Sequence, residues 1–131
     1  MIKGIGVDIV DISRIERLIM NYQDLFINKI FTQNEIEYCQ GKANASAHYA
    51  GRWAAKEAFY KALPQSCQLS STWKSIEIIN RNSFDKPFIS ICCNQLMENL
   101  LKQNITKYHV SISHERMYCI SYVILEAENE H

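Results

Sequence analysis

The chain has 131 residues and a formal net charge of zero, with 47% hydrophobic and 21% charged residues. This length and composition fit a single domain over residues 1–131 that buries one core. A chain without net charge has no overall field to attract nucleic acid or an anionic membrane, so we expect neither as a partner. No apolar run approaches the roughly 20 residues that span a bilayer.

The cysteines indicate the cellular compartment. There are five, an odd number without C-x-x-C spacing: Cys39, Cys67, Cys92, Cys93 and Cys119. This pattern argues against a disulfide framework or a zinc site and favours a reducing compartment. We therefore expect a cytoplasmic protein, and no signal peptide before the first predicted strand.

Residues 2–10 predict a strand whose two faces differ in chemistry. One face carries isoleucine and valine, and the other carries Gly4, Gly6 and Asp8. A carboxylate within a strand of β-branched residues must be paired, solvated or bound to a cation. Gly6, on the same face, leaves room for a ligand or another backbone. The structural alternative is an edge-strand aspartate that faces water.

Two capped helices are predicted next. Asp11 or Ser13 caps the first, with Ser13-x-x-Glu16 as a capping box. The second opens with the capping box Thr32-x-x-Glu35 and runs to about residue 40.

Residues 51–63 predict the central helix, which is rich in alanine and is stopped by Pro64. Its small residues allow another backbone to approach closely. Glu57 and Lys61 are four residues apart and therefore share a face. As an ordinary surface ion pair they would contribute only about 0.3–0.5 kcal/mol.

The second half predicts mainly strands. The expected elements are a polar exposed loop over 65–72, strands over 73–79, 88–92, 108–114 and 117–125, a turn over 81–87, a helix over 94–102 and a frayed tail over 126–131. The whole order predicts an α+β fold, with an antiparallel sheet and helices packed on one side.

Three polar clusters indicate a possible chemistry. They are Asp8 on a strand, Glu57 and Lys61 on a helix, and Ser111, Ser113 and His114 at a strand end. Two carboxylates from separate elements suit one Mg²⁺ ion, with water and phosphate oxygens as its other ligands. A nearby lysine stabilises charge on phosphate, and a histidine at a strand end binds an anion or passes a proton. The pattern indicates Mg²⁺-dependent chemistry on a phosphate ester or anhydride, with a surface histidine at a turn as the structural alternative for His114.

Four segments together resemble a known family. They are GIGVDIVDISRIERL (4–18), FTQNEIEYC (31–39), RWAAKEAFYKAL (52–63) and SISHERMYCISYVILE (111–126). In order and spacing they are similar to the holo-acyl-carrier-protein synthases, the small bacterial-type 4′-phosphopantetheinyl transferases. The resemblance implies that family's fold and its reaction. The reaction is transfer of phosphopantetheine from coenzyme A to a serine of an apo acyl carrier protein, with Mg²⁺ (or Mn²⁺) and release of 3′,5′-ADP.

The resemblance also implies roles for single residues. Asp8 and Glu57 match the metal ligands, Lys61 matches the lysine near the reacting phosphate, and Glu57 is our candidate base. The positions expected to bind coenzyme A are Arg52, Lys61, Lys86, Pro87, Ser113 and His114, and those expected to dock the carrier are Arg14 and Arg17. The family is a homotrimer with active sites between subunits, and we expect Asp8 from one subunit and Glu57 with Lys61 from the other.

The sequence departs from the family pattern in several places. Phe84 and Asp85 stand where glycine is usual, which adds negative charge beside the nucleotide pocket, and Pro64 replaces a glycine after the central helix. Two alternatives to the transferase stay open. One is another Mg²⁺-dependent phosphotransfer enzyme, and the other is a catalytically silent module that binds carrier proteins or coenzyme A.

Overall fold

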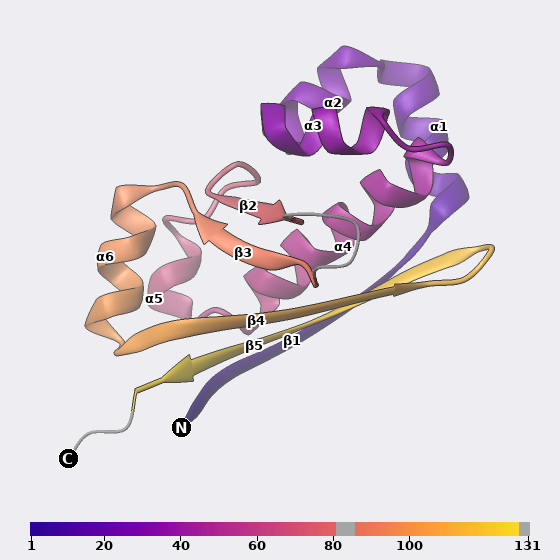
Figure 1. The fold of residues 1–131 in the computed structure, drawn as a ribbon. Coiled ribbons are helices and arrows are strands. Elements are labelled where there is room, and N and C mark those ends of the chain that lie inside the picture. The colour runs from indigo at the N-terminus through magenta and orange to yellow at the C-terminus, as the bar shows by residue number, and fades with distance from the viewer. Residues whose placement is uncertain (81–85, 129–131) are drawn as a thin grey trace.

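The computed structural model describes residues 1–80 and 86–128 (Figure 1). Its elements in chain order are β1 (Ile2–Asp11), α1 (Ile12–Tyr22), α2 (Asp24–Ile30), α3 (Gln33–Gln40), α4 (Ala45–Ala62), α5 (Gln65–Gln68), β2 (Ile76–Ile79), β3 (Phe88–Ile91), α6 (Asn94–Lys102), β4 (Ile105–His114) and β5 (Tyr118–Ala127). The α+β class is confirmed. No helix in the described residues is long and apolar enough to cross a membrane.

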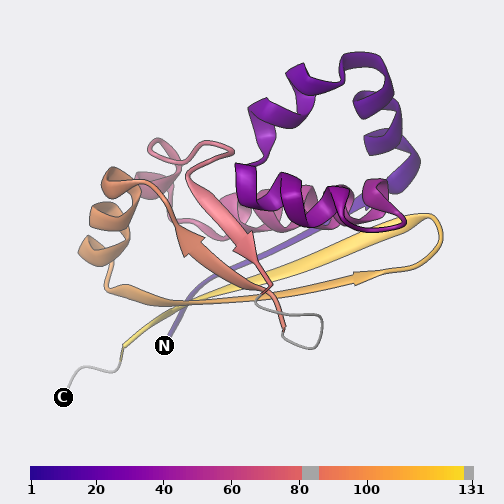
Figure 2. The ribbon, with the colours of Figure 1, turned by 45° about the horizontal axis from the view of Figure 1, so that its top comes forward.

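The strands form two antiparallel sheets. The larger has the order β1-β5-β4, so β1 and β4 are its edges, and the smaller pairs β2 with β3. The long helix α4 lies across one face of the larger sheet, and the other helices lie on that same side (Figures 1 and 2). The expected packing of helices on one side is therefore confirmed.

The contact between β1 and α4 depends on two glycines. A Cβ atom added to Gly6 would lie 1.9 Å from the carbonyl oxygen of Ala58, and one added to Gly4 would lie 1.9 Å from that of Ala62. Only glycine on the strand and small residues on the helix allow the two backbones to meet this closely. The polar face of β1 is therefore the inner face, and it brings Asp8 against α4.

The outer face of the larger sheet is apolar and exposed. Ile5, Val7 and Ile9 of β1 are 58%, 41% and 63% exposed. Val7 lies opposite Tyr122 of β5, and Ile9 lies opposite Ile120, both of which are also exposed. The sequence correctly predicted which residues of β1 share a face, but the more hydrophobic face points away from the core.

A buried ion pair joins the helices to β2. The Lys56 ammonium lies 2.7 Å from the Glu35 carboxylate, and both side chains are almost fully buried. Lys56 also donates to the carbonyl oxygens of Ile30, Trp73 and Ile76, and the same carboxylate accepts from the amide of Ile78. With every charge partnered, the pair positions α3, α4 and the start of β2 relative to one another.

Several element boundaries differ from the sequence predictions. Asp11 alone caps α1, because its carboxylate accepts from both the amide and the hydroxyl of Ser13. The central helix begins at Ala45, with Asn44 as its cap. The helix α2 and the single turn α5 were not predicted.

The strands also begin and end at other residues than expected. The strand over 73–79 begins only at Ile76, and β5 continues through Ala127 into the expected tail. The departures at Phe84 and Asp85 lie outside the described residues.

Candidate active site

The inner face of β1 and one side of α4 bring two of the predicted catalytic residues into direct contact. The Lys61 ammonium lies 2.9 Å from Oδ1 of Asp8 and 3.3 Å from the carbonyl oxygen of Val7. The Asp8 side chain is 10% exposed, whereas that of Lys61 is half exposed. Asp8 is therefore an inward carboxylate with a cationic neighbour, and the water-facing alternative is wrong.

Glu57 is electrostatically coupled to this pair. Burial and the neighbouring Asp8 carboxylate raise the pKa of Glu57, while Lys61 and Arg14 act in the opposite direction. Burial disfavours the charged form of Glu57, and the nearby Asp8 carboxylate adds repulsion that Lys61 and Arg14 only partly offset. We call Asp8, Glu57, Lys61 and Arg14 the carboxylate cluster.

One expectation about this cluster is wrong. The resemblance led us to expect Asp8 and Lys61 from different subunits of one site. The two side chains instead pair directly within a single chain, because Gly6 seats β1 against α4. The carboxylate cluster is therefore built by one subunit.

Arg14 also contacts an aromatic side chain of α4. Its guanidinium carbon is 5.1 Å from the ring centroid of Trp53, and that ring stacks on Trp73 with centroids 5.6 Å apart. Arg17 is exposed one turn further along α1 and donates to the Ser13 hydroxyl at 3.4 Å. The sequence placed both arginines on one helix face but did not show that the charge of Arg14 acts on Glu57.

Arg52, expected to bind coenzyme A, points away from the carboxylate cluster and toward Tyr38 of α3. It is 3% exposed, its guanidinium carbon lies 3.9 Å from the ring centroid of Tyr38, and it donates to Asn80 at 2.7 Å. The Lys42 ammonium lies on the same ring, at 4.7 Å. Tyr38 of α3 is thus a platform for two cations.

Two histidines extend this group to the end of β4. The ring of His48 is 5.7 Å from that of Tyr38 and 6.4 Å from that of His114. We call Lys42, His48, Arg52 and His114 the cationic cluster. The sequence singled out Arg52 and His114 but missed His48 and Tyr38. The only signal for His48 was its helical spacing from Arg52, and the only signal for Tyr38 was its place in the helix that Thr32 caps.

The two clusters lie on opposite sides of α4. Arg52 and Lys61 are nine residues apart, which is about two and a half helical turns. The carboxylate cluster accordingly lies at the β1 edge of the sheet and the cationic cluster at the β4 edge. One chain does not bring them together.

The remaining predicted ligand positions lie elsewhere. Ser113 is exposed on β4 and pairs with Ile120 in the register of the sheet, so it belongs to the outer face. Lys86 is exposed and Pro87 is half-buried, directly before β3.

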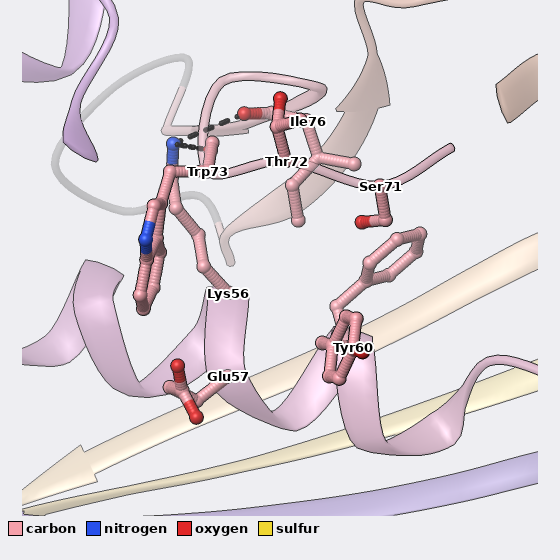
Figure 3. A pocket seen from close by; sticks show the side chains of 8 residues that line it. Lys56, Glu57, Tyr60, Ser71, Thr72, Trp73 and Ile76 are labelled. Atoms are coloured by element: carbon pink, nitrogen blue, oxygen red, sulfur yellow. Dashed lines mark hydrogen bonds between the residues drawn. The ribbon is translucent and has the colours of Figure 1, made fainter. Parts of the chain in front are cut away.

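A cavity of about 360 Å³ adjoins Glu57 (Figure 3). Its walls are mainly apolar and come from α4 and the segment before β2; the lining residues are Lys56, Glu57, Phe59, Tyr60, Ser71, Thr72, Trp73 and Ile76. The Lys56 ammonium is already occupied by carbonyl oxygens and by Glu35. Among the described lining residues, Glu57 is therefore the one charged group that is available to a ligand. The sequence missed this cavity because residues 65–72 read as an exposed loop.

The carboxylate cluster suits a hard divalent cation. Oδ2 of Asp8 is buried and has no hydrogen-bond partner among the described residues. The described residues contain no group of three or more metal-ligating side chains. Two carboxylates with open positions for phosphate and water fit the way in which Mg²⁺ binds in phosphate-processing sites.

Comparison with known proteins identifies the family. Residues 4–123 match the family model of the 4′-phosphopantetheinyl transferase superfamily. A holo-[acyl-carrier-protein] synthase of Syntrophus aciditrophicus is 40% identical, over 96% of this chain and 97% of that protein. The chain therefore belongs to the 4′-phosphopantetheinyl transferase superfamily, and the expected enzyme class is confirmed.

Solved structures of holo-[acyl-carrier-protein] synthases have the same fold as this chain. The crystal structure of holo-[acyl-carrier-protein] synthase from Neisseria meningitidis superposes with a TM-score of 0.82 at 29% identity, covering 96% of this chain and 99% of that one. The Bacillus anthracis synthase, determined in complex with CoA (3′,5′-ADP), gives 0.77 at 31% identity, covering 98% and 99%. These likenesses confirm the expected fold over nearly the whole chain.

Proposed function

We propose that this protein transfers 4′-phosphopantetheine from coenzyme A to a serine of an apo acyl carrier protein and releases 3′,5′-ADP. The observation that carries the proposal is the carboxylate cluster. In it, a buried and partly unpartnered Asp8 lies beside Lys61 and a Glu57 of raised pKa. Relatives named for this reaction match the chain over nearly its full length.

The residues of the cluster have separate tasks. The serine oxygen attacks the phosphorus that bears pantetheine, the bond from that phosphorus to the 3′,5′-ADP oxygen breaks, and Glu57 accepts the serine proton. Lys61 shares the negative charge of the diphosphate, to which its half-exposed ammonium has access.

Asp8 and Glu57 would hold a Mg²⁺ ion. When bound, this ion neutralises charge on the phosphate oxygens. Asp8 contributes a fixed ligand because Lys61 and the closely packed β1 hold its side chain in place.

The donor and acceptor would bind around Glu57. The apolar cavity beside Glu57 suits the uncharged pantetheine arm, since Lys56, the cation among its described lining residues, is already paired with Glu35. Arg14 and Arg17 of α1 would meet an acidic face of the carrier protein. Arg14 lies close enough to Glu57 to influence its pKa, so a carrier bound there would present its serine near the base.

We further propose that the protein assembles as a homotrimer with active sites between subunits. The exposed isoleucine and valine side chains of β1 and the exposed side chains Tyr118, Ile120 and Tyr122 of β5 form a continuous apolar face, which in water favours self-association. Assembly would also allow the carboxylate cluster of one subunit to meet the cationic cluster of its neighbour. Sedimentation velocity measures this directly, and a stable monomer would contradict it.

Intact-protein mass spectrometry of an apo acyl carrier protein tests the reaction. Incubation with this protein, coenzyme A and Mg²⁺ should add one phosphopantetheine group, and an EDTA control should add none. Glu57→Gln should reduce the transfer rate by about 100-fold or more while the variant stays folded. Glu126→Gln, which changes an exposed carboxylate paired with His109, is the matched control and should transfer normally. Coenzyme A binding without any transfer would favour the silent binding module instead.

A further inference from the structure

The cationic cluster contains four basic side chains and no paired carboxylate. The ion pairs in the described part of the chain are Lys56 with Glu35, Lys61 with Asp8, and His109 with Glu126. None involves a member of this cluster. Around Tyr38, two cations instead contact the face of one aromatic ring. Lys42 and Arg52 thus bring like charges together without a counter-charge among the described residues, which favours a bound anion.

Arg52 supplies a second and independent sign of a ligand. The residue is 97% buried, since only 3% of its surface is exposed. Nη2 donates to Asn80, but Nε is buried and has no partner within the described residues. A buried guanidinium N–H without an acceptor is costly, so this position is suited to an oxygen atom that the chain itself does not provide.

His48 adjoins Arg52 and differs from it in being able to change its charge. The two residues are four apart on α4 and therefore share a face. Burial, followed by the charges of Arg52, Lys42 and His114, lowers the pKa of His48 from its ordinary 6.5. In the described structure the groups that face it are Tyr38 of α3, Lys42 after α3, Arg52 of α4 and His114 of β4. At neutral pH the His48 imidazole is therefore uncharged in the free protein.

We propose that His48 is a further ligand of the nucleotide phosphates of coenzyme A, and that it takes up a proton when they bind beside Arg52. This inference rests on the proposed function, because it takes coenzyme A as the donor. The phosphate oxygens supply the missing acceptor for Arg52 and the missing negative charge for the cluster. Protonated His48 then donates one more charge-assisted hydrogen bond to phosphate.

The sign of the coupling follows from linkage. An anion favours the charged form of a neighbouring imidazole, so the pKa of His48 is higher in the complex than in the free protein. Between those two values, binding consumes protons, and the affinity for coenzyme A rises as the pH falls. For one proton the change is at most about tenfold per pH unit.

Isothermal titration calorimetry of coenzyme A near pH 6.5, in two non-phosphate buffers with different ionisation enthalpies, measures the proton uptake. The wild-type protein should take up more protons than His48→Gln, by a fraction of one proton per site. The His109→Gln variant, which changes an exposed histidine paired with Glu126, should behave as wild type. His114→Gln shows whether the uptake belongs to the other histidine of the cluster.

A titration of the histidine ring signals by NMR, with and without coenzyme A, provides a readout on the wild-type chain even if a variant misfolds. The His48 ring should titrate at higher pH in the complex. Unchanged proton uptake in His48→Gln, uptake lost only in His114→Gln, or an unmoved His48 titration would each overturn the inference. If one of these results is obtained while the wild type binds coenzyme A and transfers phosphopantetheine in the mass-spectrometry assay, the inference about His48 fails and the proposed function holds. If the wild type does not bind coenzyme A, both fail.

Discussion

The two sides of α4 differ in the charges that they gather. On the β1 side, two carboxylates lie near Lys61 and Arg14, and Oδ2 of Asp8 has no partner among the described residues. On the β4 side, three basic groups contact Tyr38 and His114 extends them, and Nε of Arg52 has no partner among the described residues. The first side has an open position for a cation, and the second has one for an anion. A metal complex of a phosphorylated nucleotide supplies both, provided that the two sides face each other across subunits.

One helix can contribute to two half-sites because successive residues point in different directions around its axis. Residues nine apart on α4 point in opposite directions. No local motion of a side chain would bring Arg52 to Lys61, so in the proposed trimer a second copy of the chain would complete the site. The exposed apolar face of the larger sheet offers a surface on which that copy can pack.

Subunit complementation tests whether the two clusters act at one site. Glu57→Gln and Arg52→Gln should each lower transfer by about 100-fold. Trimers in which the two variants are mixed should regain about a quarter of the wild-type rate, since random assembly places two intact clusters together at one site in four. Steady-state transfer rates of co-expressed, differently tagged variants measure the recovery.

The matched control mixes Glu57→Gln with Lys61→Met. Both changes damage the carboxylate cluster, so no interface combines intact halves and no recovery is expected. If the first mixture also fails to recover while its subunits demonstrably exchange, the clusters do not share a site.

Glycine substitutions test how closely α4 packs against β1 on one side and against β4 on the other. Gly6→Ala places a methyl group against a backbone oxygen of α4, so the free energy of unfolding should fall by about 1–3 kcal/mol or more. Gly51→Ala meets only a side-chain methyl of Ile112 at 3.1 Å and should cost less. Urea denaturation ranks the variants.

Gly41→Ala is the control for that series. The nearest atoms lie at 3.5 Å and its φ of −75° suits any residue, so the substitution should stabilise the protein by about 0.4–1 kcal/mol. Equal stability of Gly6→Ala and Gly41→Ala would show that β1 does not pack on α4 as described.

Charge reversal on α1 should affect the carrier protein and not the nucleotide. Arg14→Glu should raise KM for the carrier by about tenfold at low salt, with the difference shrinking as salt is added. Lys102→Glu, at the end of the distant α6, should leave KM unchanged. A parallel loss of coenzyme A affinity in Arg14→Glu, measured by calorimetry, would place Arg14 in the donor site.

The smallest expected effect is a shift in acid sensitivity. Because the pKa of Glu57 is raised above its ordinary 4.5, protonation should remove the carboxylate, and with it Mg²⁺ affinity, at a higher pH than for an ordinary glutamate. Lys61→Met removes a charge that lowers this pKa, so its profile should shift to still higher pH. Carbon-13 NMR of the Glu57 carboxyl follows both titrations, and an unshifted variant would argue against the coupling.

The sequence predicted the parts of each cluster better than their arrangement. The strand over 2–10 and the helix over 51–63 were found because alternation and alanine content are local signals. The approach of β1 to α4 was anticipated only as room beside Gly6, since a tertiary contact leaves no periodic trace. The outward direction of Ile5, Val7 and Ile9 goes against their hydrophobicity, and the proposed trimer would cover them with another chain. His48 gave no signal beyond its helical spacing from Arg52, because its role also depends on Tyr38 and His114, which are distant in the sequence.

Adjacent residues Lys56 and Glu57 limit where the chain can change length. Lys56 is held inside the fold by Glu35, while Glu57 faces the cavity and Asp8. One residue inserted between Ala50 and Lys56 would rotate the following helix by about 100°. The ammonium would then occupy the position of the base, and Glu35 would face alanine as an unpaired buried charge, at a cost of about 3–5 kcal/mol. We therefore expect related chains to differ in length in their loops and to keep α4 free of insertions and deletions.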